Sequence, residues 1–179
     1  MKTINNELIR SLTPCYDPSR YIKDEAETLP ILEWASKYRG TVPDKDIIWL
    51  LLHKEFLSDK ELRLFAVWCV REALKLVDNP DPLSIEVCNV TERYANGEAM
   101  YAELEAAWTA VYLAYLAARS AAVYDAANYA VAYALQAAVY AATYATYAAV
   151  YATDAATYAA AGDTTIRASQ LNKLLTYFK

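Results

Sequence analysis

The stretch that decides the fold is YAATYATYAAVYATDAATYAA, residues 140–160. It contains three copies of one seven-residue unit: YAATYAT (140–146), YAAVYAT (147–153) and DAATYAA (154–160). Seven residues are close to two helical turns, so this repeat predicts an α-helix with distinct faces. At 100° per residue, the fifth position of the unit lies about 40° from the first around the helix, so six tyrosines form one stripe. They are Tyr133, Tyr140, Tyr144, Tyr147, Tyr151 and Tyr158.

The two main faces of this helix predict different uses. Alanines gather on a second face, where their small side chains allow another helix to pack closely. A tyrosine ring buries apolar area but keeps a hydroxyl that needs water or an acceptor, so the stripe suits a partly wet boundary. We expect the stripe to complete a helical core, with a protein interface and a ligand wall as the alternatives.

The same composition extends over residues 101–161, which contain 27 Ala and 11 Tyr and neither Gly nor Pro. One straight helix of this length would be about 90 Å long. We therefore expect either a break near Ser120, Asp125 and Asn128 or a protruding helix that needs a partner. Residues 126–153 carry no charge, but polar side chains and tyrosines fill the middle of this segment, so no membrane span is predicted.

The first hundred residues show ordinary helical periodicity and no persistent strand alternation. Pro30 and Pro43 each open a predicted helix, and Ser58 with Glu61 forms a capping box at the start of another. Further helices are predicted from Asp81 to Asn96 and from Thr165 to Phe178. The predicted helices are 30–40, 43–52, 58–77, 81–96, one or more over 101–161, and 165–178.

These patterns predict an all-α helical bundle in a single domain, residues 1–179. Residues 1–97 form a half with short helices, 98–162 the Ala/Tyr-rich region, and 163–179 a docking helix. The chain of 179 residues is 56% apolar with only 3 Gly and 6 Pro, which excludes collagen-like and strongly disordered classes.

Charge and cysteine content restrict the partners and the compartment. The net charge is −5 and the basic residues are scattered, so nucleic acid is not an expected partner. Cys15, Cys69 and Cys88 match neither a disulfide framework nor a zinc-ligand spacing, which favours the cytoplasm. Residues 1–12 lack the apolar run of a secretory signal and are treated as mature sequence.

No catalytic, cofactor or metal motif is recognisable. His53 is the single histidine and follows an apolar helix, where a helix-end position is expected. Cys69 lies beside Phe65 and Trp68 on an apolar face, which predicts a buried, inert thiol. Neighbouring carboxylates are two residues apart and point to different helix faces, so a shared acid/base or metal site is not expected.

Arginines and aromatic residues between 58 and 95 offer one binding hypothesis. Arg63 lies four residues after Asp59 and is predicted to pair with it along the helix. Trp68, Arg71, Arg93 and Tyr94 could converge into a cationic aromatic pocket for an anion or a partner carboxylate. Structural ion pairing of Arg71 and Arg93 is the alternative that we favour.

The segments KELRLFAVWCVR (60–71), DPLS (81–84), ERYA (92–95) and GEA (97–99), followed by an Ala-rich helix, resemble a family of bacterial and phage proteins described as immunity proteins. The resemblance covers approximately residues 29–161. It implies an all-helical, non-enzymatic protein that binds a toxin or a defence system. Members of the family carry Arg, Asp and Trp in the Ala-rich helix, whereas this chain carries Tyr.

We therefore expect a cytoplasmic binding protein of immunity or anti-defence type that neutralises a toxin or host-defence protein by direct contact, through the tyrosine stripe or the Arg71/Arg93 region. One alternative is a phage sponge for a nucleotide-derived immune messenger, with tyrosines stacking on a base and Arg63, Arg71 or Arg93 meeting phosphate. The other is a structural homo-oligomer in which alanine faces pack between chains.

Overall fold

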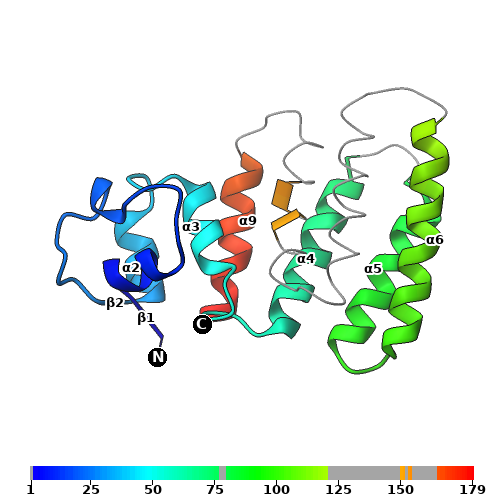
Figure 1. Ribbon diagram of the computed structural model, residues 1–179, viewed down its shortest axis with the longest axis horizontal. Helices are drawn as coiled ribbons and strands as arrows, with labels where there is room; N and C mark the ends of the chain where they lie inside the picture. Colours follow the sequence, from blue (N-terminus) through cyan, green and yellow to red (C-terminus); the bar gives the residue numbers. More distant parts are fainter. Residues whose placement is uncertain (1, 77–79, 121–149, 152, 155–164) are drawn as a thin grey trace.

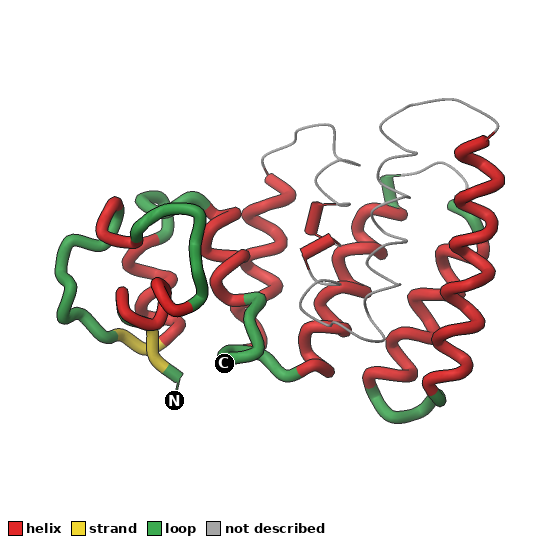
Figure 2. The backbone as a smooth tube through the Cα atoms, viewed as in Figure 1, coloured by secondary structure: helices red, strands yellow, loops and turns green. Residues whose placement is uncertain are grey.

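A computed structural model describes residues 2–76, 80–120, 150, 151, 153, 154 and 165–179, the side chains of 114–120 excepted. Most of these residues are helical, and the strands among them form one two-stranded ladder. The helices lie side by side in a row, with the N-terminal elements at one end and α6 (Tyr101–Ser120) at the other (Figures 1 and 2). The predicted all-α class is confirmed.

A small ladder begins the chain. Strand β1 (Thr3–Ile4) pairs antiparallel with β2 (Leu29–Pro30), and Ile4 lies opposite Leu29. Our sequence interpretation of this half as purely helical was wrong at this point. Two residues per strand are too few to show the alternation that identifies a strand in sequence.

Between these strands lie a short α-helix and a 3₁₀ turn, neither of which we predicted. Helix α1 (Asn6–Ser11) is capped by Asn5, whose side chain accepts a hydrogen bond from the Leu8 amide at 2.8 Å. The 3₁₀ helix η1 (Pro18–Arg20) follows. At six residues, α1 is too short for its apolar spacing to stand out in the sequence.

The next two helices begin where proline predicted them. Helix α2 (Ile31–Tyr38) starts directly after Pro30, and α3 (Asp44–Leu51) directly after Pro43. Each proline therefore lies one residue before its helix, where the missing amide proton costs no helical hydrogen bond. Gly40 follows α2 at φ 87°, a left-handed conformation that a glycine adopts without strain.

Local caps also determine where the next two helices begin. At the start of α4 (Asp59–Leu74), the Ser58 amide donates to Glu61 Oε2 at 2.8 Å and the Glu61 amide donates to Ser58 Oγ at 3.3 Å. This reciprocal pair confirms the predicted capping box. Helix α5 (Pro82–Ala95) begins after Asp81, whose carboxylate accepts the backbone N–H of the second helical residue.

The C-terminal helix lies in the middle of the row. Helix α9 (Thr165–Leu175) continues as the 3₁₀ helix η2 (Thr176–Phe178) and lies between α3 and α4 (Figure 1). Its Gln170 is only 1% exposed, and Nε2 donates to the Thr153 carbonyl at 2.9 Å. The predicted docking helix is therefore confirmed.

The core joins the N-terminal elements, α3, α4 and α9 into one cluster of buried side chains. The largest fully buried apolar members are Ile4, Ile47, Ile48, Leu51, Leu52, Leu57, Leu62, Phe65, Leu171 and Leu174. Because Leu171 and Leu174 meet residues from the first half of the chain, α9 depends on packing across the sequence rather than on local propensity.

One predicted helix end was wrong, and one predicted break lies outside the described residues. Helix α4 was predicted to reach Val77 but ends at Leu74. Helix α6 confirms the helical interpretation up to Ser120, whereas the predicted break at Asp125 or Asn128 lies in residues 121–149, outside the described part. Within the described part, no helix combines the length and the apolar character needed to cross a bilayer.

Candidate functional site

Arg63 joins α4 to α5 through an aromatic contact. Its guanidinium carbon lies 5.4 Å from the centroid of the Tyr94 ring on α5, which is a cation–π distance. Its Nη2 also lies 3.5 Å from the Asp59 carboxylate one turn earlier, so the predicted pair is confirmed. Helices α4 and α5 pack against each other. Arg63 therefore connects the two helices through Tyr94 and also joins the first turn of α4 to the second through Asp59.

Arg71 and Arg93 are each paired with a carboxylate. Arg71 Nη2 lies 2.5 Å from Glu92 Oε2 and 3.3 Å from Asn89 Oδ1, both on α5. Arg93 Nη2 lies 2.7 Å from Glu103 Oε2 on α6. The ion-pair interpretation therefore describes both arginines, and each pair crosses to the next helix of the row. An anionic ligand at either arginine would compete with a carboxylate.

The Trp68 ring packs against apolar side chains of the core. Its ring is stacked on Phe65, with centroids 6.2 Å apart and an interplanar angle of 17°, and it contacts the buried core. The residues proposed for one cationic aromatic pocket thus make three kinds of contact: a cation–π pair between Arg63 and Tyr94, two ion pairs, and ring packing at Trp68.

Tyr151 is the one stripe tyrosine among the described residues. It is half-buried and packs against the core, next to Val150. Close by in sequence, the Asp154 carboxylate accepts from Arg167 of α9 at 3.0 Å. The other stripe members, Tyr133, Tyr140, Tyr144, Tyr147 and Tyr158, lie outside the described residues.

The surroundings of His53, Cys69 and Cys88 indicate structural roles for all three side chains. His53 follows α3, and its Nδ1 lies 2.9 Å from the Trp49 carbonyl and 3.0 Å from the Leu50 carbonyl, the helix-end position that we predicted. Burial raises the pKa of the Cys69 thiol well above its usual range and that of Cys88 to about 11. In the described part of the chain, no group of His, Cys, Asp and Glu is large enough to hold a metal ion.

Helix α6 carries an aromatic surface that our sequence analysis missed. Tyr101, Trp108 and Tyr112 fall within about 40° of one another around the helix, and we call these three residues the aromatic flank. The rings of Trp108 and Tyr112 stack with centroids 5.4 Å apart at 24°. Leu104 and Val111 are buried on the neighbouring side of the helix, so the flank borders the packed side of α6.

Exposure and charge distinguish the aromatic flank from a packed core face. Tyr101 is 49% exposed and Tyr112 is 40% exposed, although both are large aromatic side chains. Exposed Glu105 lies next to Tyr112 around the helix, and Glu98 precedes α6. The helical spacing of Tyr101, Trp108 and Tyr112 could have identified the flank, but the uniform Ala/Tyr composition obscured it.

Comparison with known proteins finds no matching family model, no matching curated protein and no matching solved structure. The geometry of this chain therefore has to indicate its function. The best-defined candidate contact surface of the chain is the aromatic flank of α6, the helix at the end of the row opposite the N-terminal elements (Figure 1).

Proposed function

We propose that the chain is a non-enzymatic, cytoplasmic binding protein of immunity or anti-defence type, which neutralises a protein toxin or host-defence component by direct contact. The observation that carries this proposal is the aromatic flank on the terminal helix of the row, where Tyr101 and Tyr112 are exposed and Trp108 is half-buried. Tyr and Trp are enriched in protein interfaces and at the residues that supply most of the binding energy. A stacked Trp–Tyr pair also loses little conformational freedom on binding.

Charge around the flank indicates the chemistry of the partner. The chain has a net charge of −5, and exposed Glu98 and Glu105 lie close to the flank in sequence. Complementary charge accelerates association and excludes partners of like charge. The surface therefore fits a folded protein with an apolar recess and a basic border, and we expect association to slow as ionic strength rises.

Two double variants, one on α6 and one with a substitution on each of α5 and α6, test this proposal. Tyr101→Ser/Tyr112→Ser removes the exposed rings of the flank, whereas Ile85→Ser/Leu113→Ser removes two apolar side chains, 44% and 59% exposed, from other faces. Each variant is co-expressed with a panel of bacterial toxins, and growth rescue and co-purification of the toxin are measured. We expect wild type and the second variant to protect cells, and the flank variant to lose both effects. Equal protection by both folded variants would refute the assignment of the flank.

The sponge alternative makes a different prediction. Phosphate would have to displace Asp59, Glu92 or Glu103 from Arg63, Arg71 or Arg93. Calorimetry with a panel of cyclic nucleotides measures this directly, because a sponge binds its messenger tightly without a protein partner. Light scattering tests the homo-oligomer alternative, in which alanine faces would pack between copies of the chain. A monomer that binds no cyclic nucleotide favours the protein-binding proposal.

A further inference from the structure

A cavity of about 270 Å³ lies between the N-terminal elements, α3 and α9, and shares no lining residue with the aromatic flank. One wall is the loop of residues 14–22, a second is α3, and a third includes Asp154 together with Arg167 of α9. This volume lies just below the range of about 300–1,000 Å³ that is typical of small-molecule sites. It suits one ring or two fused rings rather than a nucleotide dimer.

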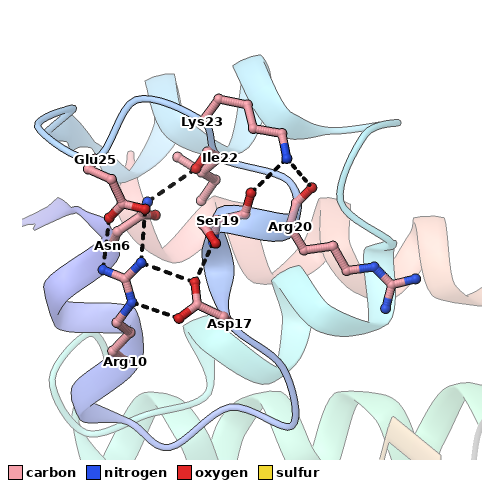
Figure 3. A network of polar contacts seen from close by, with 8 residues as sticks. All are labelled: Asn6, Arg10, Asp17, Ser19, Arg20, Ile22, Lys23 and Glu25. Atoms are coloured by element: carbon pink, nitrogen blue, oxygen red, sulfur yellow. Dashed lines mark hydrogen bonds and ion pairs between the residues drawn. The ribbon is translucent and has the colours of Figure 1, made fainter.

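Polar contacts outside the cavity hold its loop wall in place (Figure 3). The Arg10 guanidinium bridges two carboxylates, with Nε 3.0 Å from Asp17 Oδ2 and Nη1 2.8 Å from Glu25 Oε2. Buried Asn6 donates from Nδ2 to the Ile22 carbonyl at 3.2 Å. These contacts tie the middle of the loop, its end at Ile22 and the residue Glu25 just beyond it to α1, so the wall is formed before a ligand arrives. A preformed wall lowers the ordering cost of binding.

The interior of the cavity is mostly apolar and aromatic. Tyr16 and Tyr21 meet edge to face, with ring centroids 5.4 Å apart, and Trp34, Ile48 and Trp49 also line the cavity. Aromatic side chains attract a planar ring by burial of apolar area and by stacked or edge contacts. The lining therefore selects a flat, largely apolar molecule.

Charges beside the cavity indicate an acidic group on that molecule. Both carboxylates of the lining have a hydrogen-bond donor as partner: Asp46 accepts from the Tyr16 hydroxyl at 2.7 Å, and Asp154 accepts from Arg167. Lys45 lines the cavity, is exposed and has no ion pair with any described carboxylate. The Arg20 guanidinium adds positive charge 5.4 Å from the Tyr21 ring.

We propose that this cavity binds a small planar aromatic carboxylate, with its ring against the tyrosines and tryptophans of the lining and its carboxylate at Lys45. A charge-assisted contact of this kind contributes more than a neutral one. The proposal is independent of the aromatic flank, since it needs no protein partner.

Cys15 provides a local measurement of occupancy. It is exposed and lines the cavity, whereas Cys69 and Cys88 are buried. The full-length folded chain is treated with iodoacetamide, and alkylation of Cys15 is followed by mass spectrometry with 1-naphthoate, its neutral analogue 1-naphthamide, or cyclohexanecarboxylate. We expect 1-naphthoate to slow alkylation of Cys15 several-fold, and the two analogues to protect less. Calorimetry gives the corresponding dissociation constants.

A matched pair of lysine variants tests the charge assignment. Lys45→Met should weaken 1-naphthoate binding about tenfold and leave 1-naphthamide binding unchanged, as the loss of one charge-assisted contact predicts. Lys60→Met removes an exposed lysine outside the cavity lining and should change neither affinity. Three results would overturn the proposal: an unchanged Cys15 alkylation rate at millimolar 1-naphthoate, equal affinities of 1-naphthoate and 1-naphthamide, or equal effects of the two lysine substitutions.

Discussion

Replacing Leu171 with alanine should destabilise the protein by about 3 kcal/mol, within a range of 2–5 kcal/mol. Leu171 is fully buried on α9, which lies between α3 and α4. The substitution removes three carbon atoms from the core, and each buried methylene is worth about 0.8 kcal/mol, which gives about 2.4 kcal/mol. The space left behind adds to this cost, since neighbours relax only partly.

Urea unfolding followed by far-ultraviolet circular dichroism measures this change. We expect a lower midpoint with an unchanged dependence on urea concentration, because the surface exposed on unfolding stays nearly the same. Leu113→Ala, at a position that is 59% exposed on α6, is the control and should change stability by less than about 0.5 kcal/mol. A loss below about 1 kcal/mol for Leu171→Ala would refute the docking of α9 in the core.

Ser58→Ala should cost about 1 kcal/mol of unfolding free energy, because it removes the side chain that caps the Glu61 amide. Thermal melting measures this change, and an undiminished stability would contradict the cap. Hydrogen bonding to Arg10 lowers the pKa of both Asp17 and Glu25, so stability should be greatest above their ordinary values of 3.8 and 4.5 and fall as the pH drops below them. Urea midpoints between pH 7 and pH 3 should show this fall in wild type and a shallower one in Arg10→Met, while parallel curves would assign no role to the Arg10 contacts. Thiol titration with Ellman's reagent should detect Cys15 alone in the native protein and all three cysteines in urea, so a second reactive thiol in the native state would contradict the burial of Cys69 or Cys88.

The helix starts could be predicted from sequence because their determinants are local. A capping residue and its partner lie three residues apart, as Ser58 and Glu61 do, and the side-chain oxygen is within reach as soon as one turn forms. Asp81 and Pro82 are an equally local signal, since the Asp81 carboxylate caps the helix that begins at Pro82. Arg63 could be paired with Asp59 for the same reason, since both lie on one face of one helix.

Contacts between elements could not be predicted in this way. Arg71 meets Glu92 and Arg93 meets Glu103 only when α4, α5 and α6 adopt one relative register, which depends on the packing of their buried faces. The ladder between β1 and β2 joins residues about 25 positions apart through two residues on each side. The cavity likewise combines Tyr16, Asp46 and Arg167, whose separation in sequence leaves no local signal.

Helix α9 contributes to both the core and the cavity, so ligand binding in the cavity should depend on the docking of α9. Arg167 lines the cavity, and Leu171, one turn later, is buried in the core. A ligand that needs this wall binds only while α9 is docked, so it stabilises the folded state by about 2.7 kcal/mol at a hundred times its Kd. 1-Naphthoate should therefore raise the Tm of both wild type and Leu171→Ala, whereas Lys45→Met should respond less at the same concentration. Thermal melts with and without 1-naphthoate measure this, and an unchanged Tm in wild type would show that the folded protein does not bind 1-naphthoate.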